Sequence, residues 1–131
     1  MKVIHESGTR KTAVARATLV GGGGVVRVNS CLLSALPQNI FRAKIEEPLL
    51  LAGDTAKKVN IDVRVCGGGP NSQAEAVRLA IAKVLAVFDK KLHSKYLEYD
   101  RAFTVADVRR KETHKPNCHG KARAKRQKSY R

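Results

Sequence analysis

The chain has 131 residues, 43% of them hydrophobic, which is enough for one domain with a modest core. Its 26 Lys and Arg residues against 11 Asp and Glu residues give a formal net charge of +15, an excess that indicates a polyanionic partner such as nucleic acid. No apolar run approaches the roughly 20 residues of a membrane span, and three cysteines are an odd number without paired spacing, so a membrane-spanning protein and a disulfide framework are excluded.

The first third of the sequence predicts a β-hairpin after a short polar lead at 1–8. Residues 11–20 alternate a small apolar face with a face that carries charge, which is typical of a strand, and residues 25–29 form a second β-rich run. The four glycines at 21–24 lie between the two runs. We expect them to form a mobile hairpin tip rather than a phosphate cradle, because no helix follows them.

Two short helices and a strand are predicted next. Pro37 suits a first helical turn, and apolar residues recur at helical spacing beyond it, but Pro48 should interrupt the pattern. We therefore expect helices over 37–46 and 47–52. The clearest strand follows at 58–65, where Val and Ile alternate with Lys, Asn, Asp and Arg.

A long buried helix is predicted after the glycine run at 67–69, which permits a tight reversal of the chain. Asn71 or Ser72 can cap this helix, and apolar residues between 74 and 88 fall on one face. A shorter amphipathic helix is expected at 90–99, with Leu92, Tyr96 and Leu97 on its apolar face.

The chain is expected to divide into a globular α/β RNA-binding body, 1–106, and a basic C-terminal arm, 107–131. Residues 102–105 can form a brief last strand of the body, and beyond them no apolar periodicity remains. Residues 109–131 hold ten basic residues and one acidic residue, or +9, which leaves 16 basic and 10 acidic residues, or +6, for the rest. The arm lacks the Trp, Phe and Leu face of an interfacial helix, so nucleic acid is the expected partner rather than a membrane surface.

The glycine turn that precedes the long helix is a candidate phosphate-contacting turn, formed by Gly67, Gly68, Gly69 and Gln73. It lacks the Lys-Ser/Thr of a P-loop and the spacing of the dinucleotide fingerprint. A bound nucleotide, a bound RNA phosphate and a purely structural turn all stay open at this point.

Neither a metal site, nor a cofactor, nor a catalytic site is expected. His114, Cys118 and His119 fall short of the paired spacing of a structural zinc site. Glu46 and Glu47 are neighbours in sequence, so they lie on different faces of a helix and do not form a carboxylate pair. We therefore expect a protein that is not an enzyme.

Several stretches resemble a known family. They read GTRKTAVARATLV, EPLLLAG, VNIDVRVCGGG followed by QAEAVRLAIAKVL, EYDR, VRRKETHKP and the terminal RAKRQKSYR. Together they resemble the S-nine family of small-subunit ribosomal proteins, in its archaeal and eukaryotic branch, from about Gly8 to Arg131. Val108 departs from the family pattern, in which Pro usually precedes the paired Arg, and the four-glycine stretch is looser than usual.

The resemblance implies an α/β (α+β, two-layer) fold with a mixed sheet of about four strands, helices packed on it, a left-handed βαβ crossover and an extended basic C-terminal tail. It implies a structural constituent of the small subunit, placed in its head and found in the cytoplasm. The implied partners are small-subunit ribosomal RNA, the peptidyl-site tRNA and neighbouring head proteins. Neither a membrane nor a homo-oligomer is implied.

The resemblance also gives roles to the basic residues. Ribosomal RNA contacts are expected for Arg10, Lys11, Arg16, Arg109, Arg110, Lys115, Lys121, Arg123, Lys125 and Arg126. Contacts with the peptidyl-site tRNA are expected for Lys128, Ser129, Tyr130 and Arg131. Two alternatives stay open, a nucleotide-binding enzyme that uses the glycine turn and a nucleic-acid-binding protein outside the ribosome.

Overall fold

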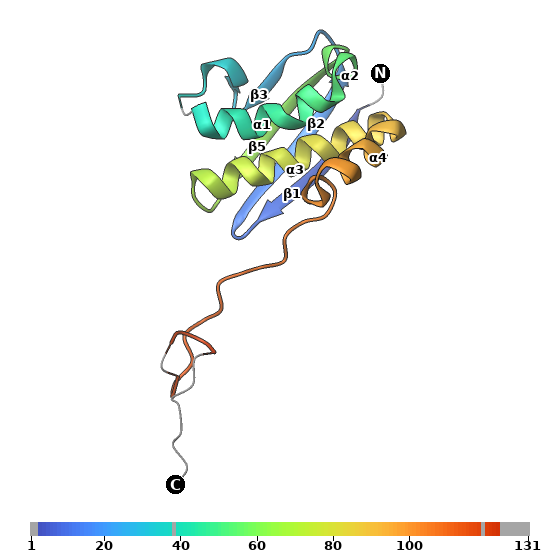
Figure 1. Ribbon diagram of the computed structural model, residues 1–131. Helices are drawn as coiled ribbons and strands as arrows, with labels where there is room; N and C mark the ends of the chain where they lie inside the picture. Colours follow the sequence, from blue (N-terminus) through green and yellow to red (C-terminus); the bar gives the residue numbers. More distant parts are fainter. Residues whose placement is uncertain (1–2, 38, 119, 124–131) are drawn as a thin grey trace.

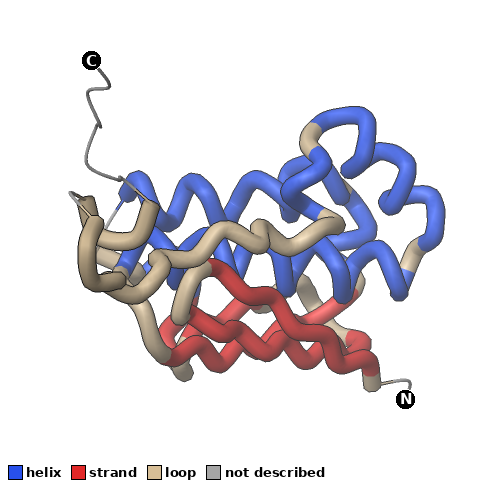
Figure 2. The backbone as a smooth tube through the Cα atoms, turned by 90° about the horizontal axis from the view of Figure 1, so that it is seen from below, coloured by secondary structure: helices blue, strands red, loops and turns tan. Residues whose placement is uncertain are grey.

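The computed structural model describes residues 3–37, 39–118 and 120–123. They form the expected α+β arrangement of two layers, a five-stranded mixed sheet and a layer of helices (Figure 1). Seen from below, the helices cover one face of the sheet and leave the opposite face without a covering helix in the part of the chain that is described (Figure 2). None of the described helices is both long enough and apolar enough to cross a membrane.

The sheet has the strand order β1-β2-β5-β3-β4. β1 pairs with β2, β2 with β5 and β3 with β4 in antiparallel fashion, whereas β3 and β5 run parallel. The bounds are Ile4–Arg10 for β1, Ala13–Gly21 for β2, Val26–Val28 for β3, Cys31–Leu32 for β4 and Val59–Cys66 for β5.

Four α-helices and two short 3-10 helices make the second layer. The α-helices are α1 Asn39–Ala52, α2 Asp54–Lys57, α3 Pro70–Phe88 and α4 Lys90–Tyr99, and the 3-10 helices are Leu33–Ala35 and Arg101–Phe103. The predictions of β5, the long helix α3 and the helix α4 are confirmed. The cap of α3 was predicted wrongly, because Gly69 is the N-cap residue and Pro70 opens the first turn in place of a side-chain cap.

The parallel pair β3 and β5 is joined through α1 by a left-handed crossover (Figure 1). In Figure 1 the helices lie in front of the sheet, and with the direction of β3 and β5 taken as upward, β5 lies to the left of β3. The crossover is thus an exception to the usual right-handed connection of parallel strands, and the expected handedness is confirmed.

β1 is the additional strand, and the prediction of a polar lead at 1–8 is wrong. In β1 only Ile4 and Gly8 are buried, so the alternation of apolar side chains that marks a strand is missing from the sequence. A Cβ atom added to Gly8 would lie 2.3 Å from the carbonyl oxygen of Ala76 in α3. The strand therefore lies with its backbone against the long helix, which only glycine permits.

The predicted hairpin of residues 11–20 and 25–29 is also wrong, because β5 lies between β2 and β3. The glycine loop that joins these two strands is fixed to β5: Asn60 Oδ1 accepts hydrogen bonds from the backbone N–H groups of Gly23 (3.0 Å) and Val25 (3.1 Å). A local pattern shows two strands and a turn, but it cannot show that a strand 30 residues later in the chain is inserted between them.

α1 is one continuous helix where two were expected. Pro48 lies inside it and is fully buried, while Pro37 precedes the helix. The proline lacks the N–H group that would bond the carbonyl of Lys44, yet the helix continues past it, and two side chains of α4 bind later carbonyl groups of α1. Tyr96 Oη donates to Pro48 O (2.8 Å) and Lys95 Nζ donates to Leu51 O (2.6 Å).

The core lies between the sheet and α3, where the small side chains of Ala13, Ala15 and Ala17 on β2 allow the helix to approach closely. At one end Phe103 is buried in the second 3-10 helix and stacks on Tyr96, with ring centroids 5.2 Å apart. The predicted strand at 102–105 is therefore wrong. Leu97 is 44% exposed and does not belong to the core.

β1 forms an edge of the sheet, and two contacts occupy that edge. Lys83 Nζ, from α3, donates to the carbonyl oxygen of Ser7 over 3.2 Å. At the end of the strand, Arg10 forms a single parallel bridge with Asp107. The C-terminal arm therefore starts beside β1.

Candidate nucleic-acid interface

The root of the arm is fastened to the turn between β1 and β2. Arg10 Nη1 lies 3.2 Å from Asp107 Oδ2, and the backbones of these residues form the parallel bridge. Arg110 Nη1 donates to Lys11 O over 2.7 Å. From this point the chain runs away from the body (Figure 1). Two of the predicted RNA-binding arginines thus determine where the arm begins.

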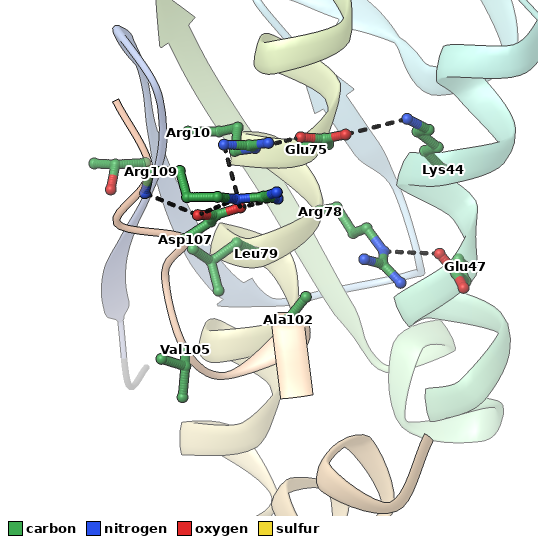
Figure 3. A pocket seen from close by; sticks show the side chains of 11 residues that line it. Arg10, Lys44, Glu47, Glu75, Arg78, Leu79, Ala102, Val105, Asp107 and Arg109 are labelled. Atoms are coloured by element: carbon green, nitrogen blue, oxygen red, sulfur yellow. Dashed lines mark hydrogen bonds and ion pairs between the residues drawn. The ribbon is translucent and has the colours of Figure 1, made fainter. Parts of the chain in front are cut away.

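Arg10 is also the centre of an ionic cluster beside a cavity of about 320 Å³ (Figure 3). Its Nε donates to Glu75 Oε2 over 2.7 Å, and Lys44 Nζ lies 3.3 Å from Glu75 Oε1. Burial raises the pKa of the Glu75 carboxyl, but the hydrogen bonds from Arg10 and Lys44 outweigh it and hold that pKa below its usual value. With 16% of its side chain exposed, Arg10 serves the body and has little surface left for RNA.

A second arginine of this cluster, Arg78, was not singled out in the sequence. Its Nε lies 2.7 Å from Glu47 Oε2 of α1, and its Nη2 donates to Asp100 Oδ2 over 3.0 Å. The guanidinium carbon lies 4.0 Å from the centroid of the Phe103 ring, within cation–π range. Arg78 therefore joins α1 and α3 to the segment that leads into the arm (Figure 3).

Arg109 is paired but accessible. Its Nη2 lies 2.6 Å from Asp107 Oδ2, and 80% of its side chain is exposed. The side-chain and backbone hydrogen bonds from Arg109 hold the pKa of Asp107 well below the usual range. Because solvent surrounds the Arg109 guanidinium, this group can also bind a phosphate oxygen.

The described part of the arm turns back on itself between residues 112 and 123. Arg123 pairs with Glu112, and the backbone N–H of Lys115 donates to Lys121 O over 2.7 Å. The hydrogen bond from Arg123 lowers the pKa of the Glu112 carboxyl. This loop brings Lys115 and Lys121 next to each other, so one part of the extended tail is folded back on itself.

Five predicted RNA-binding cations make no ion pair with any residue in the described ranges: Lys11, Arg16, Arg110, Lys115 and Lys121. All five are exposed. Lys11 lies in the turn after β1 with a φ of 54°, and Arg16 points away from the helices on β2. The remaining predicted contacts lie outside the described residues: Lys125, Arg126, Lys128, Ser129, Tyr130 and Arg131.

The uncovered face of the sheet holds two more exposed arginines that the sequence analysis missed, Arg27 on β3 and Arg64 on β5. Arg64 is the register partner of Arg16 across the β2–β5 pair. The alternation in 58–65 already placed Arg64 on a polar face, but only the strand order puts it beside Arg16. A groove of about 810 Å³ runs along this face.

The glycine turn is explained by close packing of two backbones. Gly67 and Gly68 have φ values of 76° and 65°, which favour glycine. A Cβ atom on Gly67 would lie 2.5 Å from Thr12 O, and Gln73 Nε2 donates to Gly67 O over 3.0 Å. The structural alternative thus accounts for Gly67, Gly68 and Gln73, and contact of this turn, including Gly69, with a phosphate stays a prediction.

Among the described residues, no group of three or more His, Cys, Asp or Glu side chains is placed to hold a metal ion. His114 and Cys118 belong to these residues, whereas His119 lies outside them. Cys31, Cys66 and Cys118 are all free thiols.

Comparison with known proteins gives the family. The family model described as ribosomal protein S9/S16 matches residues 8–131. The chain belongs to this family. The small ribosomal subunit protein uS9 of Methanococcus maripaludis, strains C7 and S2, is 45% identical to it over 134 residues, which cover all of both chains. The corresponding protein of Methanococcus vannielii is 44% identical with the same coverage.

The S9/S16 family consists of structural ribosomal proteins and is not a family of enzymes. The alternative of a nucleotide-binding enzyme that uses the turn at 67–69 is thereby excluded. The charge, the exposed cations and the basic arm are those of a polyanion-binding protein.

Proposed function

We propose that the chain is a structural constituent of the small ribosomal subunit, and that it binds ribosomal RNA through its basic arm and the exposed cations around the root of that arm. The observation that carries this proposal is the full-length identity of 45% to proteins named as components of the small subunit. Two features of the chain support it: the +9 of residues 109–131 and the exposure of Lys11, Lys115 and Lys121.

RNA binding in this proposal is an exchange of partners. Phosphate oxygens replace Asp107 at Arg109 and Glu112 at Arg123, because both guanidinium groups are exposed and solvent screens their ion pairs. Lysines that make no ion pair with a described residue gain phosphate partners without losing any of those contacts. Each phosphate that is neutralised releases counterions, and this release offsets the entropy that the arm loses when RNA orders it.

The finer placement rests on the resemblance of the motifs. We infer that the body lies in the head of the small subunit beside other head proteins, as a single copy, in cytoplasmic ribosomes. In this arrangement Lys125 and Arg126 face ribosomal RNA, and Lys128, Ser129, Tyr130 and Arg131 reach the backbone of the peptidyl-site tRNA. Arg forks match phosphate oxygens, and Tyr130 offers a ring or a hydroxyl group.

Sedimentation tests the proposal. The tagged, full-length protein should co-sediment with small subunits on a sucrose gradient at high salt, where loosely bound basic proteins are released. Large subunits run on a parallel gradient are the control, because a protein that merely adheres to RNA binds both subunits. A protein that stays at the top of the gradient, or that follows both subunits equally, is a nucleic-acid binder outside the ribosome and contradicts the proposal.

A further inference from the structure

The face of the sheet that no described helix covers is built from the outward residues of four neighbouring strands (Figure 2). Strand register arranges these residues in rows across the sheet. One row is Ser7, Arg16 and Arg64, and the next is His5, Thr18, Asp62 and Arg27. The groove of about 810 Å³ lies over three of the strands that carry these rows, β1, β2 and β5.

Arg16 and Arg64 lie directly opposite each other on antiparallel strands. Side chains in this relation have Cβ atoms about 5 Å apart, and like charges placed so destabilise the sheet. Both arginines are exposed, and neither makes an ion pair with a described residue. The body thus places two positive charges together where its own stability gains nothing from them.

The one acidic side chain in these two rows does not cancel the charge. Asp62 is in register with Thr18 on one side and with Arg27 on the other, which leaves three arginines against one carboxylate within the rows. Glu6 also lines the groove, but on β1 it falls in the opposite alternation, in register with the buried Ala17. The remaining side chains in the rows are short hydroxyls and an imidazole: Ser7, Thr18 and His5, whose Nδ1 lies 3.0 Å from Thr18 Oγ1. The two rows are therefore cationic and rich in hydrogen-bond donors.

These properties select the chemistry of the partner. None of the five strands contains Phe, Tyr or Trp, so the face offers no platform on which bases can stack. Paired guanidinium groups with hydroxyls beside them suit phosphate oxygens and the ribose 2′-hydroxyl. An RNA backbone matches this face, whereas the arginine pair would repel a second copy of the chain.

We propose that the open face of the sheet is a second RNA-binding surface, which holds the sugar–phosphate backbone of ribosomal RNA over Arg16 and Arg64 and acts independently of the arm. This inference rests on the proposed RNA-binding function and adds a surface to it. The body then holds RNA on the open face of the sheet, while the arm leaves the body at the Arg10 end of β1.

The test measures the salt dependence of binding of the full-length protein to a labelled transcript of small-subunit ribosomal RNA. The double variant Arg16→Ala/Arg64→Ala removes two phosphate contacts, so the slope of log K against log salt should become shallower by about 1.4 to 1.8. The charge-preserving variant Arg16→Lys/Arg64→Lys should keep the slope.

The matched control is Lys91→Ala/Arg101→Ala, which removes the same charge from exposed positions on the helical side and should leave the slope unchanged. Urea unfolding of each variant provides a second measurement. The midpoint of Arg16→Ala/Arg64→Ala should not fall, because that change relieves a repulsion, so a loss of binding cannot be assigned to loss of fold.

An arm variant, Lys115→Ala/Lys121→Ala, separates this inference from the proposed function. If the arm variant lowers the slope and the sheet variant does not, RNA binding stands and the open face is not an RNA surface. If neither changes it, the RNA-binding function fails together with the inference. A sheet variant that binds RNA normally but no longer joins the small subunit marks a protein-binding face and also overturns the proposal.

Discussion

Arg10 and Arg16 lie six positions apart on neighbouring strands, and their surroundings give them different uses. The side chain of Arg10 is 16% exposed and is held by Glu75 and Asp107, so it joins β1, α3 and the root of the arm. Arg16 is exposed on the opposite face of the sheet without an ion pair to the described residues. The direction of a side chain relative to the sheet therefore decides which arginine is free for RNA.

The pair formed by Arg10 and Glu75 makes stability depend on pH in the acid range. The pKa of Glu75 is lowered in the folded protein, so its contribution is fully present above the ordinary value of 4.5 and is lost as the pH falls below it. Glu75→Gln should lower the free energy of unfolding by about 1 to 2 kcal/mol at neutral pH, because Arg10 loses its charged partner. The difference from the parent should shrink below pH 4.5.

Urea titrations at several pH values measure this difference. Asp54→Asn is the matched control, because Asp54 also pairs with a lysine, Lys57, but both side chains are largely exposed and solvent screens them. Its effect should be much smaller than that of Glu75→Gln at neutral pH. A loss for Glu75→Gln that stays the same from neutral to acid pH would show that the charge of Glu75 is not what stabilises the body.

At the scale of elements, the contact between β1 and α3 depends on a missing side chain. A Cβ atom on Gly8 would lie 2.3 Å from Ala76 O and 2.7 Å from Ala80 N, and both are backbone atoms that cannot turn aside. Gly8→Ala should therefore destabilise the protein by about 2 to 3 kcal/mol, as overpacking does. The urea midpoint should fall accordingly.

Gly23→Ala is the control for this prediction. The space around Gly23 is open within 4 Å, so the same substitution should change the free energy of unfolding by less than about 0.5 kcal/mol. If both variants have the parent's midpoint, β1 does not lie on α3 as described.

The helices and strands also show which structural features the sequence alone can predict. β5, α3 and α4 were predicted because each has a strong period of its own, 2 or 3.6 residues, which does not depend on the rest of the chain. β1 and the insertion of β5 between β2 and β3 were missed, because they depend on contacts between distant segments. Pro48 was misjudged for the same reason, since it is fully buried and in contact with Tyr96 of another helix, which the local pattern does not show.

The candidate RNA interface also has features that the sequence predicted and features that it could not predict. The charge of the arm can be counted from the sequence, and Lys115 and Lys121 are exposed as that count suggests. The count could not show that Arg10 forms an ion pair with Glu75, because the two residues lie 65 positions apart in the sequence. It also could not show that Arg64 faces Arg16, because register is a property of the assembled sheet.

At the scale of the whole molecule, most of the net charge lies in the arm, whereas the apolar core lies in the body. The body buries its apolar side chains between the sheet and α3, while residues 109–131 hold +9 of the net +15. Changes at the end of the arm should therefore alter binding without altering the stability of the body.

Removal of Ser129 to Arg131 tests this separation. The truncated protein should keep the urea midpoint of the parent and should still co-sediment with small subunits, because the body and most of the arm are intact. Ribosomes that carry it should release peptidyl-site tRNA faster, since one Arg and one Tyr no longer contact the tRNA backbone. Equal tRNA off-rates from truncated and intact ribosomes would reject the proposed contact.

The edge of the sheet at β1 has a further consequence for the newly made protein. An unoccupied edge strand is a template for pairing with the same strand of another molecule, and this is how many β proteins aggregate. Here the ammonium group of Lys83 donates a hydrogen bond to the carbonyl of Ser7, and the start of the arm forms a bridge with the end of the strand at Arg10. These two contacts should therefore hinder fibre-like stacking of copies of the chain during the interval between synthesis and assembly.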